Sequence, residues 1–162
     1  MKENGLIAYG YEGGLIPITR EQAIAEVESL EAEMGFRLTD DYREFVIRTN
    51  GAEVPDQSRY IVLNSSRAKR LCMANHFYGV IDPVDRKSFL ILRTNWEWFT
   101  GSQPLGMLPI GCDGFGNPFI LQLEEDGRGM ISFFNLDKDD FEGVLAESFS
   151  EFLELLGPEP ES

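Results

Sequence analysis

The chain has 162 residues, 43% of them apolar, and its 28 acidic and 14 basic side chains give a formal net charge of −14. This length and apolar content indicate one compact domain with its own core. The acidity argues against binding to a nucleic-acid backbone, which it would repel, and no apolar run approaches the roughly 20 residues of a membrane span. Because no signal-type segment opens the chain, we expect a soluble, cytoplasmic protein.

The negative charge is concentrated in the second half of the chain. Residues 82–162 carry 16 acidic and 5 basic side chains, a formal charge of −11. Such a field would steer a basic protein toward it, although solubility alone would also explain an acidic surface.

The first helix is predicted after an N-terminal segment, residues 1–18, that has room for one short strand. Thr19 and Gln22 have the spacing of a capping box, and Gly35 is a typical helix end. The apolar positions between them lie on one helical face. These positions are Ile24, Val27, Leu30 and Met34.

A second helix is predicted from Asp40 to Thr49. Acidic residues suit its first turn, and the Asn50-Gly51 pair that ends it tolerates positive φ. We expect its buried face to hold Tyr42, Phe45 and Val46.

The middle of the chain alternates short strands with polar segments. Strands are predicted at about residues 60–63 and 76–81, with a basic cluster, Arg67–Arg70, in the segment between them. Apolar residues then recur at helical spacing over residues 89–99, which predicts a helix there.

The last third reads as an antiparallel meander followed by a helix. Three apolar runs, "GMLPIG", "PFILQLE" and "GMISFFNL", are joined by the turns "DGFGN" and "EDGRG". Ser148 and Glu151 have the spacing of a second capping box, and the helix they begin ends at Gly157-Pro158, before a frayed tail at 158–162. We therefore predict an α+β domain whose antiparallel sheet, of about four to six strands, packs against N-terminal and C-terminal helices.

The glycine-rich segment "PIGCDGFGNPFIL", residues 109–121, does not read as a phosphate-binding loop. A Walker loop needs a lysine where Asn117 stands, and a dinucleotide-binding loop needs a helix where "PFILQL" predicts a strand. The simplest interpretation is a structural turn. Gly114 and Gly116 would supply positive φ, and Asp113 and Asn117 would bond to the local backbone.

Metal and nucleophilic chemistry remain weaker alternatives. The acidic group from Asp137 to Glu142 lacks the order of an EF-hand, although its oxygens could bind calcium. Zinc needs three or four Cys or His ligands, and the chain offers Cys72, His76 and Cys112 in total. A cysteine–histidine nucleophile is formally possible, but a free, buried thiol explains each cysteine more simply. We expect no metal, no cofactor and no catalytic residue.

Four segments together resemble the SUKH superfamily, also called the Smi/Knr-like family. They are "LTDDYREFVIRTNGA", "HFYGVID", "LPIGCDGFGNPFILQL" and "AESFSEFLELL", and they follow in the family's order over residues 19–157. Thr39 and Ala52 depart from the usual proline and glycine, at a helix start and end where both are acceptable.

The resemblance implies an α+β domain at residues 19–157 that binds proteins and is not an enzyme. Bacterial members of the family commonly act as immunity proteins that neutralise polymorphic or contact-dependent toxins, so the expected partner is a basic toxin domain, such as a nuclease, encoded nearby. Eukaryotic relatives regulate wall synthesis, which leaves a regulatory scaffold in wall or envelope metabolism as the alternative. A small enzyme of unknown reaction ranks third.

The predicted binding surface is a negative rim made by turns at the ends of the sheet. Alternate hairpin turns of a meander can lie together, and exposed tryptophans would serve as anchors. If the turns are only solvated and the tryptophans lie in the core, no such rim exists, and both readings stay open. The candidates are Asp113, then Glu124, Glu125 and Asp126, then Asp137, Asp139, Asp140 and Glu142, with Trp96 and Trp98.

Overall fold

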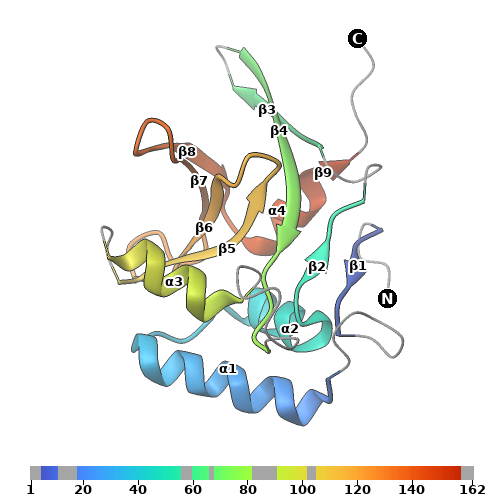
Figure 1. Ribbon diagram of the computed structural model, residues 1–162. Helices are drawn as coiled ribbons and strands as arrows, with labels where there is room; N and C mark the ends of the chain where they lie inside the picture. The colour runs from blue at the N-terminus through green and yellow to red at the C-terminus, as the bar shows by residue number, and fades with distance from the viewer. Residues whose placement is uncertain are drawn as a thin grey trace.

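The computed structural model describes residues 5–10, 18–55, 60–65, 68–81, 91–101 and 105–157, and of residues 60–65 and 68–72 it describes the backbone. Figure 1 shows its helices and strands. The helices are α1 (Arg20–Met34), α2 (Asp40–Thr49), α3 (Leu92–Thr100) and α4 (Phe149–Leu155). The strands are β1 (Ile7–Ala8), β2 (Ala52–Glu53), β3 (Tyr60–Ser65), β4 (Ala68–Phe77), β5 (Met107–Asp113), β6 (Pro118–Gln122), β7 (Ile131–Asn135), β8 (Asp140–Ala146) and β9 (Leu156–Gly157).

The strands form one antiparallel sheet in the order β1-β2-β4-β5-β6-β7-β8, with β3 paired to β4 and to β9. The predicted α+β class is confirmed, and the sheet has more strands than the four to six expected. Strand β1 lies in the N-terminal segment that was predicted to have room for one short strand. The additional strands are β2 and β9, each of two residues, and β8, in which only Ala146 is buried. Such strands carry no alternating apolar pattern that a sequence could reveal.

The two faces of the sheet are covered to different extents. Along β6, Phe119 and Leu121 belong to the main core, whereas Ile120 between them belongs to a small second cluster. Helices α1, α2 and α4 contribute to the main core together with Leu92 and Trp96 of α3, and Phe99 of α3 joins Ile120 in the second cluster. Figure 1 shows α3 in front of the strands and α4 behind them.

An aromatic group forms the centre of the main core. The ring centroid of Phe45 lies 4.8 Å from that of Phe149 and 5.5 Å from that of Phe77, and Tyr42 lies 5.0 Å from Phe149. Phe152 lies 6.0 Å from Phe77. These rings come from α2, β4 and α4, so that the two helices are packed on the sheet through one continuous aromatic contact.

The predicted helix ends are confirmed where local signals define them. Thr19 and Gln22 form the reciprocal hydrogen bonds of a capping box, and Gly35 ends α1 with φ +78°. Helix α2 has the predicted bounds and ends at Asn50 with φ +50°. The Ser148 side chain caps α4 by accepting from the N–H of Glu151, whereas the Glu151 carboxylate accepts from the N–H of Glu147. The predicted end at Gly157-Pro158 was wrong, because α4 ends at Leu155 and the next two residues pair with β3 as β9. Helix α3 confirms the helix predicted at 89–99, of which residues 89 and 90 lie outside the described residues.

The strand predicted at residues 76–81 was placed wrongly. Strand β4 begins at Ala68 and ends at Phe77, so the predicted basic loop is largely part of a hairpin with β3. Arg67 of the predicted basic cluster and the tail at 158–162 lie outside the described residues. The polar sequence of β4 does not predict a strand of this length. The strand is held by its pairing with β3, β5 and β2.

The chain leaves the sheet after β4 because it packs against the end of α2. Asn50 is fully buried, and its side-chain Oδ1 accepts hydrogen bonds from the N–H groups of Val80 (2.8 Å) and Ile81 (3.1 Å). A Cβ atom on Gly79 would lie 2.2 Å from the carbonyl oxygen of Asn50, so only glycine fits. The "TNG" segment, residues 49–51, and the "FYGVI" segment, residues 77–81, are thus two halves of one contact.

Candidate protein-binding surface

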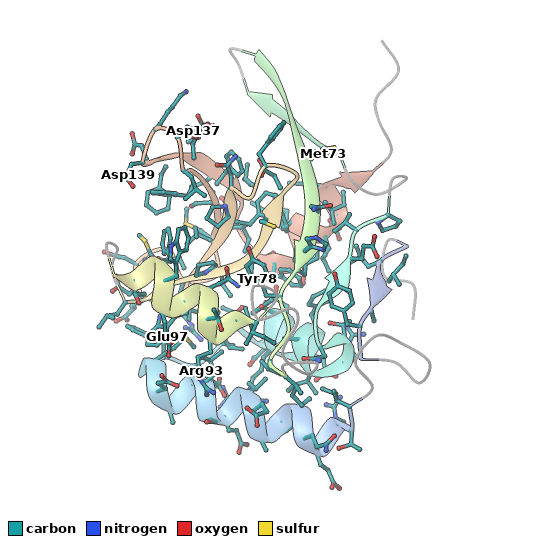
Figure 2. The ribbon with its side chains drawn as sticks, viewed as in Figure 1. Met73, Tyr78, Arg93, Glu97, Asp137 and Asp139 are labelled. Carbon is teal, nitrogen blue, oxygen red and sulfur yellow. The ribbon has the colours of Figure 1, made fainter. Side chains whose placement is uncertain are left out.

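Two of the predicted acidic turns lie together at one end of the sheet. The backbone N–H of Leu136, in the β7–β8 turn, donates to the side-chain Oδ1 of Asn117, in the β5–β6 turn, at 3.0 Å. Figure 2 shows Asp137 and Asp139 at this end, far from α1. The β6–β7 turn lies at the opposite end of the meander, because successive hairpins reverse the chain direction. The candidates therefore divide into two groups.

Asp113 organises the β5–β6 turn from within. Its Oδ1 accepts from the N–H groups of Phe115 (2.9 Å) and Asn117 (2.8 Å), and its Oδ2 accepts from the Asn117 side-chain amide (3.1 Å). The residue is 6% exposed. The Asp113 carboxylate therefore faces inward and stabilises the turn. This is the local bonding that the sequence indicated for Asp113 and Asn117.

The two glycines of this turn have different roles. Gly116 has φ +85°, as predicted, and open space around its Cβ position. Gly114 does not have positive φ, and that part of the prediction was wrong. Its N–H donates to the Met73 carbonyl of β4 at 3.1 Å, and a Cβ atom there would lie 2.7 Å from the Met73 methyl group. Gly114 thus brings the turn close to the neighbouring strand.

A valine at Gly116 should therefore destabilise the protein by about 1–3 kcal/mol, because a β-branched residue is strained at positive φ. Thermal and urea denaturation would measure the loss. An asparagine at the same position is the matched control and should cost less, since it tolerates the left-handed conformation. Equal stability of the valine variant and the parent would contradict the assigned role.

Three aspartates in and beside the β7–β8 turn are exposed, whereas the Glu142 carboxylate is hydrogen-bonded within this region. Asn135 accepts from the N–H groups of Asp137 (3.0 Å) and Lys138 (3.2 Å). Glu142 accepts from the side chains of Asn135 (3.0 Å) and Lys138 (3.1 Å), and its own side chain is 9% exposed. Asp137, Asp139 and Asp140 are exposed. These three aspartates are the members of the predicted set that can meet a partner at this end.

Two exposed apolar side chains accompany these aspartates. Phe115 is 87% exposed at the tip of the β5–β6 turn, and Leu136 is 37% exposed in the adjacent turn. Neither was predicted as a site residue. A phenylalanine between two glycines of a tight turn is a usable signal, since the tip of a turn has no core to enter. We call Phe115, Leu136, Asp137, Asp139 and Asp140 the turn-end surface.

The two tryptophans have different environments. Trp96 is 8% exposed and its Nε1 donates to the carbonyl of Leu105 at 3.1 Å, so it is part of the packing of α3. Trp98 is 59% exposed on the same helix. Of the two predicted anchors, Trp98 is therefore the one that is exposed enough to contact a partner.

The second acidic group, Glu124, Glu125 and Asp126, lies in the β6–β7 turn. Arg128 holds this turn to the helical layer by donating to the carbonyls of Leu123 (2.9 Å) and Arg37 (2.7 Å). Glu125 and Asp126 are exposed and Glu124 is half-buried. This group forms a separate negative surface from the turn-end surface.

Cys112 and His76, the candidate nucleophile and base whose side chains are described, are both engaged in local packing and hydrogen bonding. Burial, together with the nearby Asp113 carboxylate, raises the pKa of the Cys112 thiol, which keeps it protonated and weakly nucleophilic at neutral pH. The Nδ1 atom of His76 is hydrogen-bonded to the Tyr9 hydroxyl at 2.9 Å. The side chain of Cys72 is outside the described residues.

Among the described residues, no three His, Cys, Asp or Glu side chains are grouped as metal ligands. None of the described helices combines the length and apolar content that crossing a membrane requires.

Within the described residues, an antiparallel sheet with helices packed against it defines an α+β domain. A pair of turns at one end of this sheet presents apolar and acidic side chains. The model of the SMI1 / KNR4 family (SUKH-1) matches residues 23–155, and the chain belongs to this family. The resemblance seen in the motifs is thus confirmed. Comparison with curated proteins and with solved structures found no match.

Proposed function

We propose that this SUKH-1 protein is a cytoplasmic immunity protein, which binds a basic toxin domain and neutralises it without itself being an enzyme. The observation that carries the proposal is the turn-end surface. Exposed Phe115 and Leu136 lie beside exposed Asp137, Asp139 and Asp140 on two turns that a hydrogen bond joins. The family membership is compatible with this role.

The turn-end surface has the chemistry of a binding site for a cationic protein. Apolar side chains that become fully buried supply most of the affinity in protein interfaces, and an aromatic ring is a favoured anchor. Carboxylates around such an anchor attract a basic partner and speed association. In a nuclease toxin, they would occupy positions meant for phosphate groups. A toxin with a positively charged active site is therefore the partner that this surface fits best.

Co-expression with the toxin domain encoded beside this protein tests the proposal directly. The parent protein should protect the cells and form a complex with the toxin domain. Absence of both protection and a complex would contradict the immunity function. A pulldown that returned wall-synthesis or signalling enzymes would favour the regulatory alternative.

Charge reversal should show which surface the toxin meets. The variant D137K/D140K should slow association by about ten-fold at low salt and flatten its salt dependence, because it removes the attraction at the turn-end surface. Asp139 is left unchanged because it has φ +50°, where lysine would be strained. Stopped-flow measurement of association over a range of salt concentrations would determine the effect.

The variant E124K/E125K changes the net charge by the same amount at the opposite end of the sheet and is the matched control. It should slow association less than D137K/D140K. Parental association rates for both variants would show that neither acidic surface meets the toxin. Equal slowing would show that only the overall charge of the protein matters.

A further inference from the structure

The face of the sheet that carries α3 is only partly covered. Phe99 of α3 packs on Phe134 of β7 with ring centroids 5.2 Å apart, and Ile120 completes this small cluster. Beyond the cluster, toward β8 and the β6–β7 turn, lies a groove of about 290 Å³. Its lining includes Met107, Ile120, Met130, Ser132, Phe141 and Val144. We call it the sheet groove.

The sheet groove opens at an edge of the sheet. Strand β8 is the last in the strand order, and β7 is its pairing partner among the described strands. Val144 of β8 is 51% exposed, and Gly143 beside it is exposed and has no side chain to close the groove. An edge strand offers main-chain N–H and C=O groups to an added strand, and an apolar groove beside it can take the side chains of that strand.

The volume of the sheet groove suits short apolar side chains. An engineered cavity of about 150 Å³ in a protein core holds one benzene-sized molecule, so 290 Å³ has room for about two medium apolar side chains. In an added strand, these would be residues two positions apart, because alternate side chains point to the same face. The groove therefore fits an extended segment in which apolar residues alternate with others.

The acidic residues around the sheet groove favour a basic segment as the bound strand. Exposed Asp126 lies in its lining at the β6–β7 turn, and exposed Asp140 begins β8 at the opposite end. A second copy of this chain would bring the same carboxylates and a further formal charge of −14, so self-pairing is disfavoured. A strand with lysine or arginine at the positions facing solvent would be attracted instead.

We propose that the edge of β8 and the sheet groove bind an extended, basic segment of a partner protein by strand addition, with alternate apolar side chains of that segment entering the groove. The identity of the partner rests on the proposed function, in which it is the toxin domain. The binding mode rests on the groove, the edge strand and the charges described above.

A peptide experiment tests the binding mode without the toxin. The probe is a short blocked peptide in which lysine alternates with valine, added to isotope-labelled full-length protein and followed by amide shifts and hydrogen exchange. We expect shifts at Met130 and Val144 and slower exchange of β8 amides. Two control peptides should fail to produce these effects. One carries glutamate in place of lysine, and the other carries N-methylated amides, which cannot pair with a strand.

A pair of variants locates the peptide. V144K should lose peptide binding, because it places a charged side chain in the groove lining where the valines of the probe would enter, and it should fold, because Val144 is 51% exposed. The matched control is L105K, which adds the same charge at another exposed apolar residue, 58% exposed. It should bind the peptide as the parent does.

Several outcomes would overturn the proposal. They are the absence of peptide effects on β8, equal effects from the N-methylated peptide, and a dimer in sedimentation that protects the β8 amides without any peptide. Peptide binding at β8 with no toxin neutralisation would support the groove and contradict the proposed function. Peptide binding at β8 with unchanged toxin binding by V144K would overturn the assignment of the toxin's strand to this edge.

Discussion

Replacing Phe45 by alanine should lower the free energy of unfolding by about 3–5 kcal/mol. Phe45 is 1% exposed, and its ring contacts those of Tyr42, Phe77 and Phe149. Removing it leaves a cavity where α2, α4 and β4 meet, and the neighbouring rings belong to three separate elements that cannot all move in to fill it. Urea denaturation monitored by circular dichroism would measure the loss.

The matched control for Phe45 is the same substitution at Phe115. That ring is 87% exposed, so its removal should change stability by no more than about 0.5 kcal/mol. A Phe45→Ala protein as stable as the parent would show that the buried face of α2 is assigned wrongly. The control also tests the proposed function, under which Phe115→Ala should weaken toxin binding while leaving the fold intact.

Replacing Asn50 by glycine should cost about 2–4 kcal/mol, because the N–H groups of Val80 and Ile81 would lose their acceptor in a buried site. Glycine is the informative replacement, since it adopts the φ of +50° without strain and so isolates the loss of the hydrogen bonds. The same denaturation measurement applies, and the Val80 amide should exchange faster in the variant.

Alanine at Asn50 should cost roughly 1 kcal/mol more than glycine, because it adds the strain of a left-handed residue to the same lost bonds. Equal stability of the glycine variant and the parent would show that water or another group replaces the Asn50 side chain. Equal stability of the alanine and glycine variants would show that the left-handed conformation carries no cost here.

Local interactions explain which parts of the fold were predictable from sequence. The capping box at Thr19, the left-handed Gly35 and the Ser148 cap act within a few residues, so their spacing is visible in the sequence. Strands β5, β6 and β7 were visible because each is an apolar run between turn residues. Strand β8 was not, because Gly143 and register shifts against β7 interrupt its apolar pattern and only Ala146 in it is buried.

The candidate surface was predictable in its residue types and unpredictable in its assembly. The sequence showed acidic turns and indicated the local bonding of Asp113, but it could not show that Glu142 is bonded within its turn while Asp137 and Asp139 are exposed. Burial of a side chain depends on the neighbours that pairing brings to it, and the β5–β6 and β7–β8 turns meet only after the meander forms.

The sequence by itself therefore determined the helices, their caps, the α+β class and the family, because these depend on short-range spacing and on motifs in order. Only the tertiary structure decided the length of β4, the contact of Asn50 with Gly79 and the residues that make up the turn-end surface and the sheet groove. Each of these joins segments from different parts of the chain, and strand register and helix packing place them together through contacts that no local pattern records.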